Sequence, residues 1–354
     1  MKKILSYLAF ITIMITGYSY ANEAPTTEAD TNIEEAQSPY NDTGAIILLF
    51  HRFGEDKHPL TNIRLKQLDM IIAYLKDNSY TVLPLNQIIK ATKLGAKLPP
   101  KTVAITIDDA FKSTYTQAYP RFKTAGFPFT VFASTGNIDN NNPNYVTWAN
   151  ISEMHEDGVS IQNHTVNHPY LVGMNGDALL KEIENSQNAI KKITGKVPAL
   201  FSYPYGEASS EVFDVMEPFG FEAQFGQHSG VVNQTSNMRY LPRFSINEKY
   251  GTLKRLKLVL NTKPLPVKML EPINPLIKSK NPPQIRFTVG DSIKSLKNLN
   301  CYHSGVGKVN LVKNKKTVSL NFPQTFKKGR TRINCTMPHP TSGYRWYGMQ
   351  YILK

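Results

Sequence analysis

The chain has 354 residues, of which 41% are hydrophobic and 19% are charged. This composition is typical of a globular protein, and it excludes disorder for most of the length because enough apolar side chains are present to form a core. With only two cysteines, Cys301 and Cys335, the chain can form neither a disulfide-rich scaffold nor a four-cysteine zinc site.

The first residues have the features of a secretory signal peptide. Lys2 and Lys3 precede a 13-residue apolar run, Ile4–Thr16, and the small residue Ala21 follows shortly after it. A membrane span needs roughly 20 apolar residues, so the run is too short for the alternative, a membrane anchor. We therefore expect residues 1–21 to be a signal peptide that is cleaved near Ala21.

Residues 22–43 are acidic and lack an apolar run, which predicts a flexible leader. No later stretch is long and apolar enough to span a membrane. The mature protein is thus expected to be exported, to the periplasm or beyond the cell, without a transmembrane segment.

Residues 44–262 alternate short apolar runs with amphipathic stretches such as 63–76 and 178–194. Repeated strand-then-helix order predicts an α/β fold, a parallel sheet covered by helices. Six to eight such units in about 220 residues favour a compact (β/α) barrel, in which reactive side chains lie at the carboxyl ends of the strands. The expected strands are residues 45–50, 80–83, 103–107, 129–133, 159–162, 199–202, 221–225 and 239–242.

The pattern changes after a proline-rich stretch, residues 263–283, which predicts a linker. Residues 284–354 alternate with a period of two and contain no helical stretch, which predicts a small all-β domain. Cys301 and Cys335 both lie in it. In an exported protein we expect them to pair, because a disulfide stabilises so small a domain; two free thiols are the alternative.

This C-terminal region also carries the net charge of +14. Residues 1–264 contain 25 basic and 25 acidic residues, whereas residues 265–354 contain 16 Lys and Arg against two Asp and Glu. Such asymmetry concerns binding partners rather than fold. We expect residues 265–354 to contact an anionic glycan or envelope surface, and no nucleic acid, to which an exported protein has little access. Four aromatic residues in this region either stack on sugar rings or belong to its core: Tyr302, Tyr344, Trp346 and Tyr347.

Two adjacent carboxylates, Asp108 and Asp109, follow one expected strand. Adjacent carboxylates at a strand end are costly unless a cation or solvent compensates their charge. Neighbouring residues on a strand point to opposite sides, so the two would have different partners. The alternative is a helix N-cap with a second acid near the helix dipole.

Two histidines four residues apart, His164 and His168, follow another expected strand. Both can face one metal from a helical turn or a tight loop, and imidazole is the commonest nitrogen ligand of zinc. An isolated pair of this kind is more often two loop histidines. Two histidines and one carboxylate that all follow strands, however, form a three-ligand open metal site.

A third motif, Tyr203-Pro204-Tyr205-Gly206, is a turn whose backbone N–H groups can face an anion. The order Thr-Ile-Asp-Asp, His-Thr-x-x-His and Tyr-Pro-Tyr-Gly resembles the polysaccharide deacetylases of carbohydrate esterase family 4, also called the NodB homology domain. The opening Leu-Leu-Phe-His-Arg at residues 48–52 is similar to the subgroup that acts on poly-N-acetylglucosamine. The resemblance covers about residues 44–247 and implies a distorted (β/α) barrel of the NodB type.

The resemblance implies a role for each motif residue. Asp108 would be the general base. Asp109, His164 and His168 would bind one divalent metal ion, usually zinc, and the backbone N–H of Tyr205 would stabilise the oxyanion. The implied activity is metal-dependent removal of N-acetyl groups from an N-acetylhexosamine polysaccharide of the envelope or extracellular matrix.

The general acid of this reaction departs from the family pattern. Many members have a late His, but residues 241–247 contain none. Two candidates replace it. We favour His51, because a strand-end His in a barrel points into its mouth; His228 is the second candidate.

Two further positions differ from the pattern. Ala110 replaces the usual Gly after the two aspartates, and Ser202 stands where many members have the Arg that pairs with the catalytic Asp. Two other functions stay open. The same site can cleave acetate esters, as an O-acetyl esterase does, or the barrel can be a decayed, non-catalytic glycan-binding protein, although the intact motif residues argue against decay.

Overall fold

The computed structural model describes residues 44–341 and 343–354. The expected signal peptide, residues 1–21, and the expected leader, residues 22–43, lie outside the described residues. Within the described part of the chain, no helix is both long enough and apolar enough to cross a membrane.

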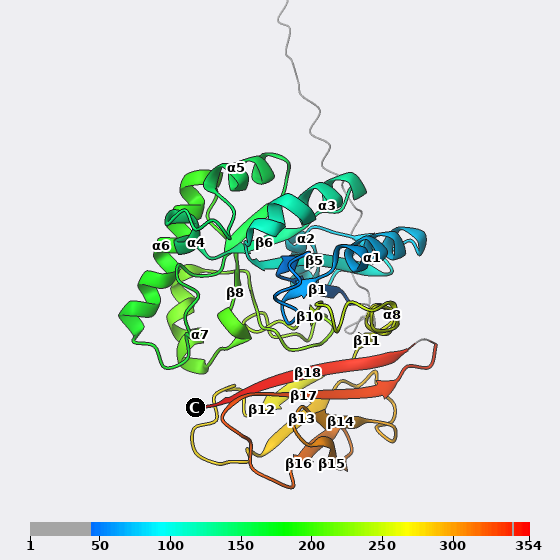
Figure 1. The fold of residues 1–354 in the computed structure, drawn as a ribbon. Helices are drawn as coiled ribbons and strands as arrows, with labels where there is room; N and C mark the ends of the chain where they lie inside the picture. Colours follow the sequence, from blue (N-terminus) through cyan, green and yellow to red (C-terminus); the bar gives the residue numbers. More distant parts are fainter. Residues whose placement is uncertain (1–43, 342) are drawn as a thin grey trace, which may run out of the picture. The chain divides into compact units, whose positions relative to one another are not determined.

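A curled parallel sheet forms the centre of the first region (Figure 1). Along the sheet the order is β10-β1-β5-β6-β7-β8-β9, with β4 also paired to β5, and every one of these pairings is parallel. The strands are β1 (Ile46–Phe50), β4 (Thr81–Val82), β5 (Thr102–Asp109), β6 (Thr130–Ala133), β7 (Ser160–Asn163), β8 (Leu200–Ser202), β9 (Ala223–Phe225) and β10 (Phe244–Ser245).

One short segment links the two edges of this sheet. Leu241 forms a parallel bridge with Phe225 of β9, and three residues later Phe244 pairs with Leu48 of β1. The sheet is therefore a distorted barrel, and the predicted α/β class is confirmed. Its central strands are almost entirely buried, as expected for parallel strands that are covered on both faces.

Helices cover the outer face of the barrel (Figure 1). They bury their apolar stripes; α1, for example, buries Leu68, Ile71 and Leu75. The α-helices are α1 (Leu65–Asp77), α2 (Leu85–Leu94), α3 (Tyr119–Ala125), α4 (Thr135–Asp139), α5 (Trp148–Glu156), α6 (Gly176–Thr194), α7 (Ser210–Met216) and α8 (Leu253–Leu260). The smaller elements are β2 (Arg52–Phe53), β3 (Asn62–Ile63), a π-helical turn (Thr114–Ala118), and two 3-10 turns, η2 (Pro204–Gly206) and η3 (Glu217–Phe219).

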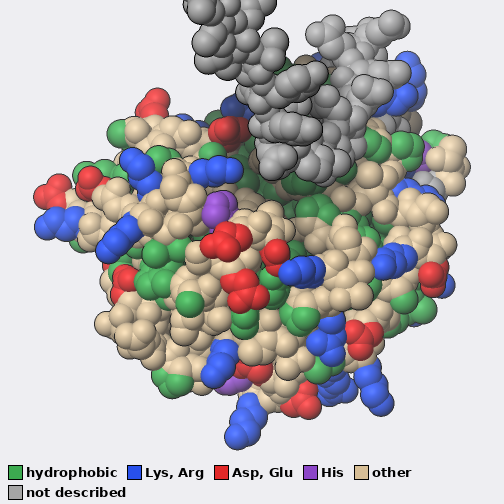
Figure 2. All heavy atoms as spheres, turned by 90° about the horizontal axis from the view of Figure 1, so that it is seen from above, with side chains coloured by type: hydrophobic (Ala, Val, Ile, Leu, Met, Phe, Trp, Pro, Cys, Tyr) green, Lys and Arg blue, Asp and Glu red, His purple; other side chains and the backbone are tan. Residues whose placement is uncertain are grey.

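The surface of this region carries both signs of charge. In the view of Figure 2, Lys and Arg side chains lie beside Asp and Glu side chains rather than in one patch. This agrees with the equal numbers of basic and acidic residues in 1–264.

The second region is an all-β sheet, as predicted. Its order is β11-β18-β17-β14-β15-β16-β13-β12, antiparallel except where β11 pairs with β18. Cys301 and Cys335 lie opposite each other and form the expected disulfide. The strands are β11 (Lys263–Pro264), β12 (Val267–Glu271), β13 (Ile285–Val289), β14 (Asn300–His303), β15 (Gly307–Asn314), β16 (Thr317–Asn321), β17 (Gly329–Pro338) and β18 (Tyr344–Leu353).

The proline-rich stretch 263–283, expected to be a linker, contains β11 and β12. These two are the edge strands of the sheet. Proline lacks a backbone N–H and is tolerated at sheet edges, so a proline-rich segment can supply both edges. The C-terminal sheet therefore begins at Lys263 rather than at residue 284.

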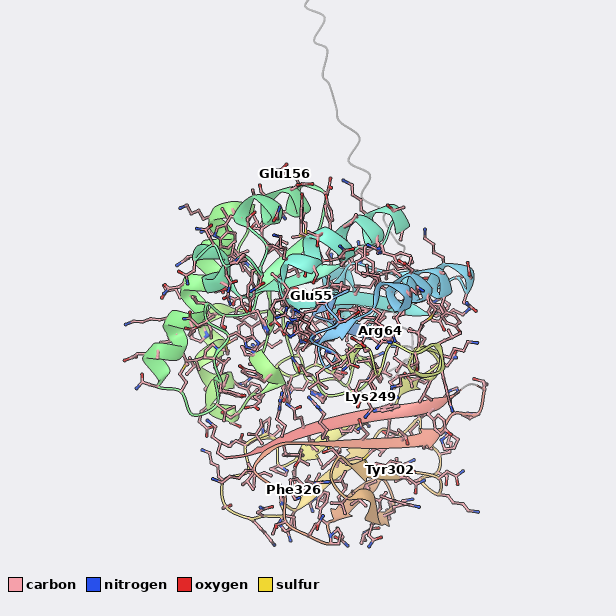
Figure 3. The ribbon with its side chains drawn as sticks, viewed as in Figure 1. Glu55, Arg64, Glu156, Lys249, Tyr302 and Phe326 are labelled. Carbon is pink, nitrogen blue, oxygen red and sulfur yellow. A yellow bond between two sulfur atoms is a disulfide. The ribbon has the colours of Figure 1, made fainter. Side chains whose placement is uncertain are left out.

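Aromatic residues of this sheet divide between surface and interior. Tyr302, labelled in Figure 3, is 44% exposed and Tyr344 is 43% exposed, whereas Phe326 is 3% exposed. Trp346 donates a hydrogen bond to Asn334 and packs edge-on against Phe244 of the barrel. Two of the four aromatic residues considered for sugar stacking are thus available on the surface.

Candidate metal and catalytic site

The side chains singled out from the sequence meet at the carboxyl edge of the barrel. Asp108 and Asp109 end β5, and His164 directly follows β7. His51 directly follows β1, and Tyr205 lies in the turn after β8. Parallel pairing places these strand ends on one edge, which is why motifs far apart in sequence come together.

Asp109, His164 and His168 form a compact cluster. Their ligand atoms all lie within 4.8 Å of one another. Asp109 Oδ1 is 3.2 Å from His164 Nε2 and 3.3 Å from His168 Nε2. Asp109 Oδ1 and His164 Nε2 are buried without a hydrogen-bond partner among the described residues. Buried polar atoms are costly when unpartnered, so this set fits a divalent cation with one carboxylate and two imidazole ligands.

Neighbouring groups orient the histidines for this role. His164 Nδ1 donates to the Ser202 carbonyl at 2.6 Å, which leaves Nε2 free as a ligand. His168 follows a tight loop in which its N–H donates to Thr165 Oγ1 and the Thr165 N–H donates to Asn163 Oδ1. Of the two arrangements expected for the histidine pair, the tight loop is the one observed.

The protonation states of His168 and Asp109 also suit a cation. Burial, and next the neighbouring His164, lower the pKa of His168 to about 4, so that its imidazole is neutral at neutral pH. Burial would raise the pKa of Asp109, but the adjacent His164 and the nearby His51 lower it overall, so the carboxylate is ionised. An ionised carboxylate and a neutral imidazole are the forms that bind metal.

Backbone strain is concentrated here. Nine described non-glycine residues have positive φ, and five of them belong to the site. Left-handed backbone costs a non-glycine residue roughly 1–2 kcal/mol, and such residues cluster where function demands an unusual side-chain direction. The five are Asp109 (74°), Ala110 (62°), Thr165 (68°), His168 (54°) and Tyr205 (60°).

Asp108 is held by an arginine that the sequence analysis did not identify. Arg243 Nη1 and Nη2 each donate to one carboxylate oxygen at 2.7 Å, and neither side chain is exposed. Ser202 Oγ donates to Asp108 Oδ2 at 3.0 Å and accepts from Arg243 Nη2 at 2.8 Å. Arg243, from the late segment, therefore supplies the arginine partner of Asp108 that position 202 supplies in the family pattern.

This pair fixes the charge of Asp108. Burial alone would raise its pKa, but Arg243 and His164 lower it below the usual value. A bidentate arginine also fixes the orientation of the carboxylate.

The two candidate acids differ in their surroundings. His51 is partly exposed. Burial lowers the pKa of His51, whereas the charges of Asp109 and Asp108 act to raise it. His51 is therefore close enough to the cluster to interact with it electrostatically. His228 is 5% exposed, packs on Tyr240 with ring centroids 4.7 Å apart and lines a separate cavity of about 610 Å³. Burial, and next Arg332 and Arg243, lower the pKa of His228 to about 3. These surroundings favour His51.

Aromatic side chains flank the cluster. Tyr205 stacks on Tyr170 at 4.0 Å and meets His168 edge-on at 4.5 Å. Tyr145 packs against Phe111; burial and next Asp109 raise the pKa of its hydroxyl. Neither Tyr145 nor Tyr170 was singled out, because each lies in a loop without a sequence pattern.

Comparisons with known proteins find similarities to the first region. Residues 95–224 match the sequence model of the polysaccharide deacetylase family. The poly-beta-1,6-N-acetyl-D-glucosamine N-deacetylase of Staphylococcus aureus (strain MSSA476) is 24% identical over 235 residues; the match covers 59% of this chain and 81% of that protein.

Solved structures share the fold of the barrel. The Streptococcus pyogenes deacetylase PplD in complex with acetate aligns with a TM-score of 0.56 and 21% identity, over 61% of this chain and 99% of that one. IcaB from Ammonifex degensii aligns with a TM-score of 0.53 and 20% identity, over 60% of this chain and 95% of that one. The three motifs lie within residues 95–224, so the part of the chain that carries the candidate site is the part that matches the polysaccharide deacetylase family model.

Proposed function

We propose that this protein hydrolyses N-acetyl groups of a poly-β-1,6-N-acetyl-D-glucosamine, the polymer named for the Staphylococcus aureus relative. One observation carries the proposal: the cluster Asp109, His164 and His168 lies beside an ionised Asp108 that Arg243 holds in place. Asp, His and His suit zinc with an open coordination position, so zinc is the proposed ion.

Each residue of the chain has a defined task in this reaction. A bound divalent ion supplies Lewis acidity at the acetyl carbonyl and lowers the pKa of a water molecule. Asp108 accepts a proton from the attacking water, whose oxygen forms a bond to the carbonyl carbon. The Tyr205 N–H donates to the oxygen that becomes negative. His51 then donates a proton to the sugar nitrogen as its bond to carbon breaks, which releases acetate and a free amine.

Arg243 has opposing effects on the base. A lowered pKa makes Asp108 a weaker base, yet it keeps the carboxylate ionised and able to accept a proton at neutral pH. The bidentate contact also prevents rotation of the carboxylate, so Arg243 contributes orientation and charge state at some cost in basicity.

We further propose an exported enzyme with three parts: a signal peptide and leader in residues 1–43, a catalytic barrel in residues 44–262 and a basic sheet after it. The lysines on β15 and in the loops of the sheet support contact with an anionic glycan or envelope surface, since they are exposed: Lys308, Lys315, Lys327 and Lys328.

Acetate release on matched substrates tests the activity. The full-length protein is incubated with a β-1,6-linked N-acetylglucosamine oligomer, a β-1,4-linked oligomer of equal length and an acetylated ester, and its metal content is measured. We expect about one divalent ion per chain and the fastest release from the β-1,6 oligomer. Release from the ester alone would indicate an O-acetyl esterase, and no release from any substrate would indicate a glycan-binding protein.

A further inference from the structure

Two strands of the C-terminal sheet contact the loops that carry the site. Arg330 on β17 donates from Nη1 to the Tyr205 carbonyl at 2.9 Å. Gln350 on β18 donates from Nε2 to the Gly206 carbonyl at 2.6 Å. The contacts reach two consecutive carbonyls of the turn that carries Tyr205.

A third contact reaches the neighbouring loop. Lys354 Nζ donates to the carbonyl of Val172, two residues after Tyr170, which stacks on Tyr205. Arg330 pairs with Ile352 across the two strands, so the three side chains come from one end of the β17–β18 pair. One end of the sheet therefore supports both loops.

The packing between β18 and the barrel is too close for a loosely tethered domain. A Cβ on Gly348, in the middle of β18, would lie 1.8 Å from the Ser229 carbonyl oxygen, so only glycine fits there. Gln350 is 2% exposed, and the Gly206 carbonyl that it contacts also accepts from the Tyr240 hydroxyl at 2.6 Å. The sheet and the barrel share a buried polar network.

The turn that Arg330 and Gln350 contact contains a residue with left-handed backbone. Tyr205 has a φ of 60°, a conformation that a tyrosine does not keep without external support. Pro204 restricts the chain on one side of it, and Arg330 and Gln350 hold the two carbonyls on the other. Arg330 is also 3.5 Å from the buried carboxylate of Glu207, which anchors the guanidinium beside the turn.

We propose that Arg330 of the C-terminal sheet is a positioning residue for deacetylation: it holds the Tyr205 turn so that its N–H meets the developing oxyanion. The proposal rests on the proposed function of the barrel. It makes the C-terminal sheet part of the catalytic unit, although the family match ends at residue 224, before that sheet begins.

Full-length variants test the role of Arg330. Loss of an oxyanion donor lowers turnover by about 10²–10³-fold, and a misplaced donor costs less, so we expect Arg330→Ala to lower kcat about 10–100-fold. KM for the β-1,6 oligomer, metal content and Tm should stay close to those of the wild type. Arg330→Lys should recover part of the loss, because an ammonium group can still donate to the Tyr205 carbonyl.

Arg286→Ala is the matched control. Arg286 lies in the same sheet and pairs with the exposed Glu271, away from the turn, so its loss should change neither kcat nor KM. The proposal is wrong if Arg330→Ala keeps the kcat of this control, if it raises only KM, or if kcat falls only in step with Tm.

Hydrogen exchange of residues 203–207 separates this proposal from the proposed function. Arg330→Ala should speed exchange in this turn and Arg286→Ala should not, whether or not the protein releases acetate. If the wild type deacetylates no glycan while exchange responds in this way, the activity is wrong and the support of the turn stands. Unchanged exchange in Arg330→Ala would overturn the support itself.

Discussion

The barrel and the C-terminal sheet each contain an arginine–carboxylate ion pair, and the two pairs differ in their exposure to solvent. In the barrel, Asp108 and Arg243 form a pair with no exposure to solvent. In the sheet, Arg286 and Glu271 form a pair of the same chemistry, but both side chains are more than half exposed. The buried pair fixes the orientation of the Asp108 carboxylate, whereas the exposed pair can be solvated equally well by water. Ion pairs of the same chemistry therefore contribute differently to the structure of the two regions.

The backbone shows the same contrast. Five residues with positive φ lie in the barrel site, whereas in the described part of the C-terminal sheet Lys315, in a turn, is the single non-glycine residue with positive φ. The sheet has one register shift, between β12 and β13, and a disulfide joins the neighbouring strands β14 and β17. The barrel edge instead contains strained loops, and one of them accepts hydrogen bonds from Arg330 on β17 and Gln350 on β18.

The largest effect should come from removal of the metal set. Asp109→Ala removes the ligand that lies between both histidines and should reduce acetate release to background, with loss of the bound ion. Metal analysis and acetate release measure this outcome, and Asp291→Ala, an exposed aspartate in the sheet, is the control. Full activity in chelated, metal-free protein would contradict the site.

Asp108→Asn should lower kcat by about 10²-fold or more, the usual effect of losing a general base. Asn has nearly the same shape as Asp, so the metal content should stay near one ion per chain. Turnover close to that of the wild type would show that Asp108 only holds Arg243.

The two ion pairs can be compared directly by unfolding. Arg243→Met leaves Asp108 buried and unpaired and should destabilise the protein by about 3–5 kcal/mol. Arg286→Met should cost at most about 1 kcal/mol, because that pair is exposed. In the double variant Asp108→Asn/Arg243→Met most of the stability should return while activity does not. Equal losses for the two single variants would contradict the contrast between the regions.

The acid assignment predicts a loss that depends on the leaving group. His51→Ala should slow acetate release from an amide far more than from an ester with a phenol-type leaving group, because a phenolate departs without a proton and an amine does not. His228→Ala is the control, since His228 lies beside Tyr240. An amide-selective loss in His228→Ala alone would reverse the assignment.

Much of the fold and the convergence of Asp109, His164 and His168 could be predicted from sequence. Each motif follows an apolar run, and the parallel order of the strands brings their carboxyl ends to one edge. Arg243 could not be predicted in this way, because it contacts Asp108 across 135 positions of sequence and belongs to no local pattern. The one signal in the sequence is the Arg of Leu241-Pro242-Arg243, which lies in the segment where the family pattern has its late His.

The contact between Arg330 of the C-terminal sheet and the Tyr205 turn could not be predicted either, because it also belongs to no local sequence pattern. The composition of residues 265–354 predicted a basic domain that binds a partner, and nothing local marks Arg330 among its lysines and arginines. Its role depends on register, which brings Arg330 beside Ile352 and near Gln350. Strands β11 and β12 escaped prediction because Pro264 lies in β11 and Pro266 and Pro272 flank β12, and prolines are compatible with a sheet mainly at its edges.

The smallest effect concerns the residue after the two aspartates. Ala110 has a φ of 62° and is fully buried, where many family members have Gly. Ala110→Gly relieves roughly 1–2 kcal/mol of left-handed strain. It also removes a buried methyl group worth about 0.8 kcal/mol and adds freedom to the unfolded chain worth about 0.4–1 kcal/mol.

These contributions nearly cancel, so the free energy of unfolding should change by less than about 1 kcal/mol. Gly126→Ala is the matched reverse change. Gly126 has a φ of 70°, and an added Cβ there would meet no atom within 4 Å. The Gly126→Ala variant therefore measures the cost of left-handed backbone alone, partly offset by the lower conformational freedom of the unfolded chain. It should destabilise the protein by about 1 kcal/mol or less. A clear loss of stability in Ala110→Gly would mean that the methyl group packs the site and offsets the strain of its own backbone.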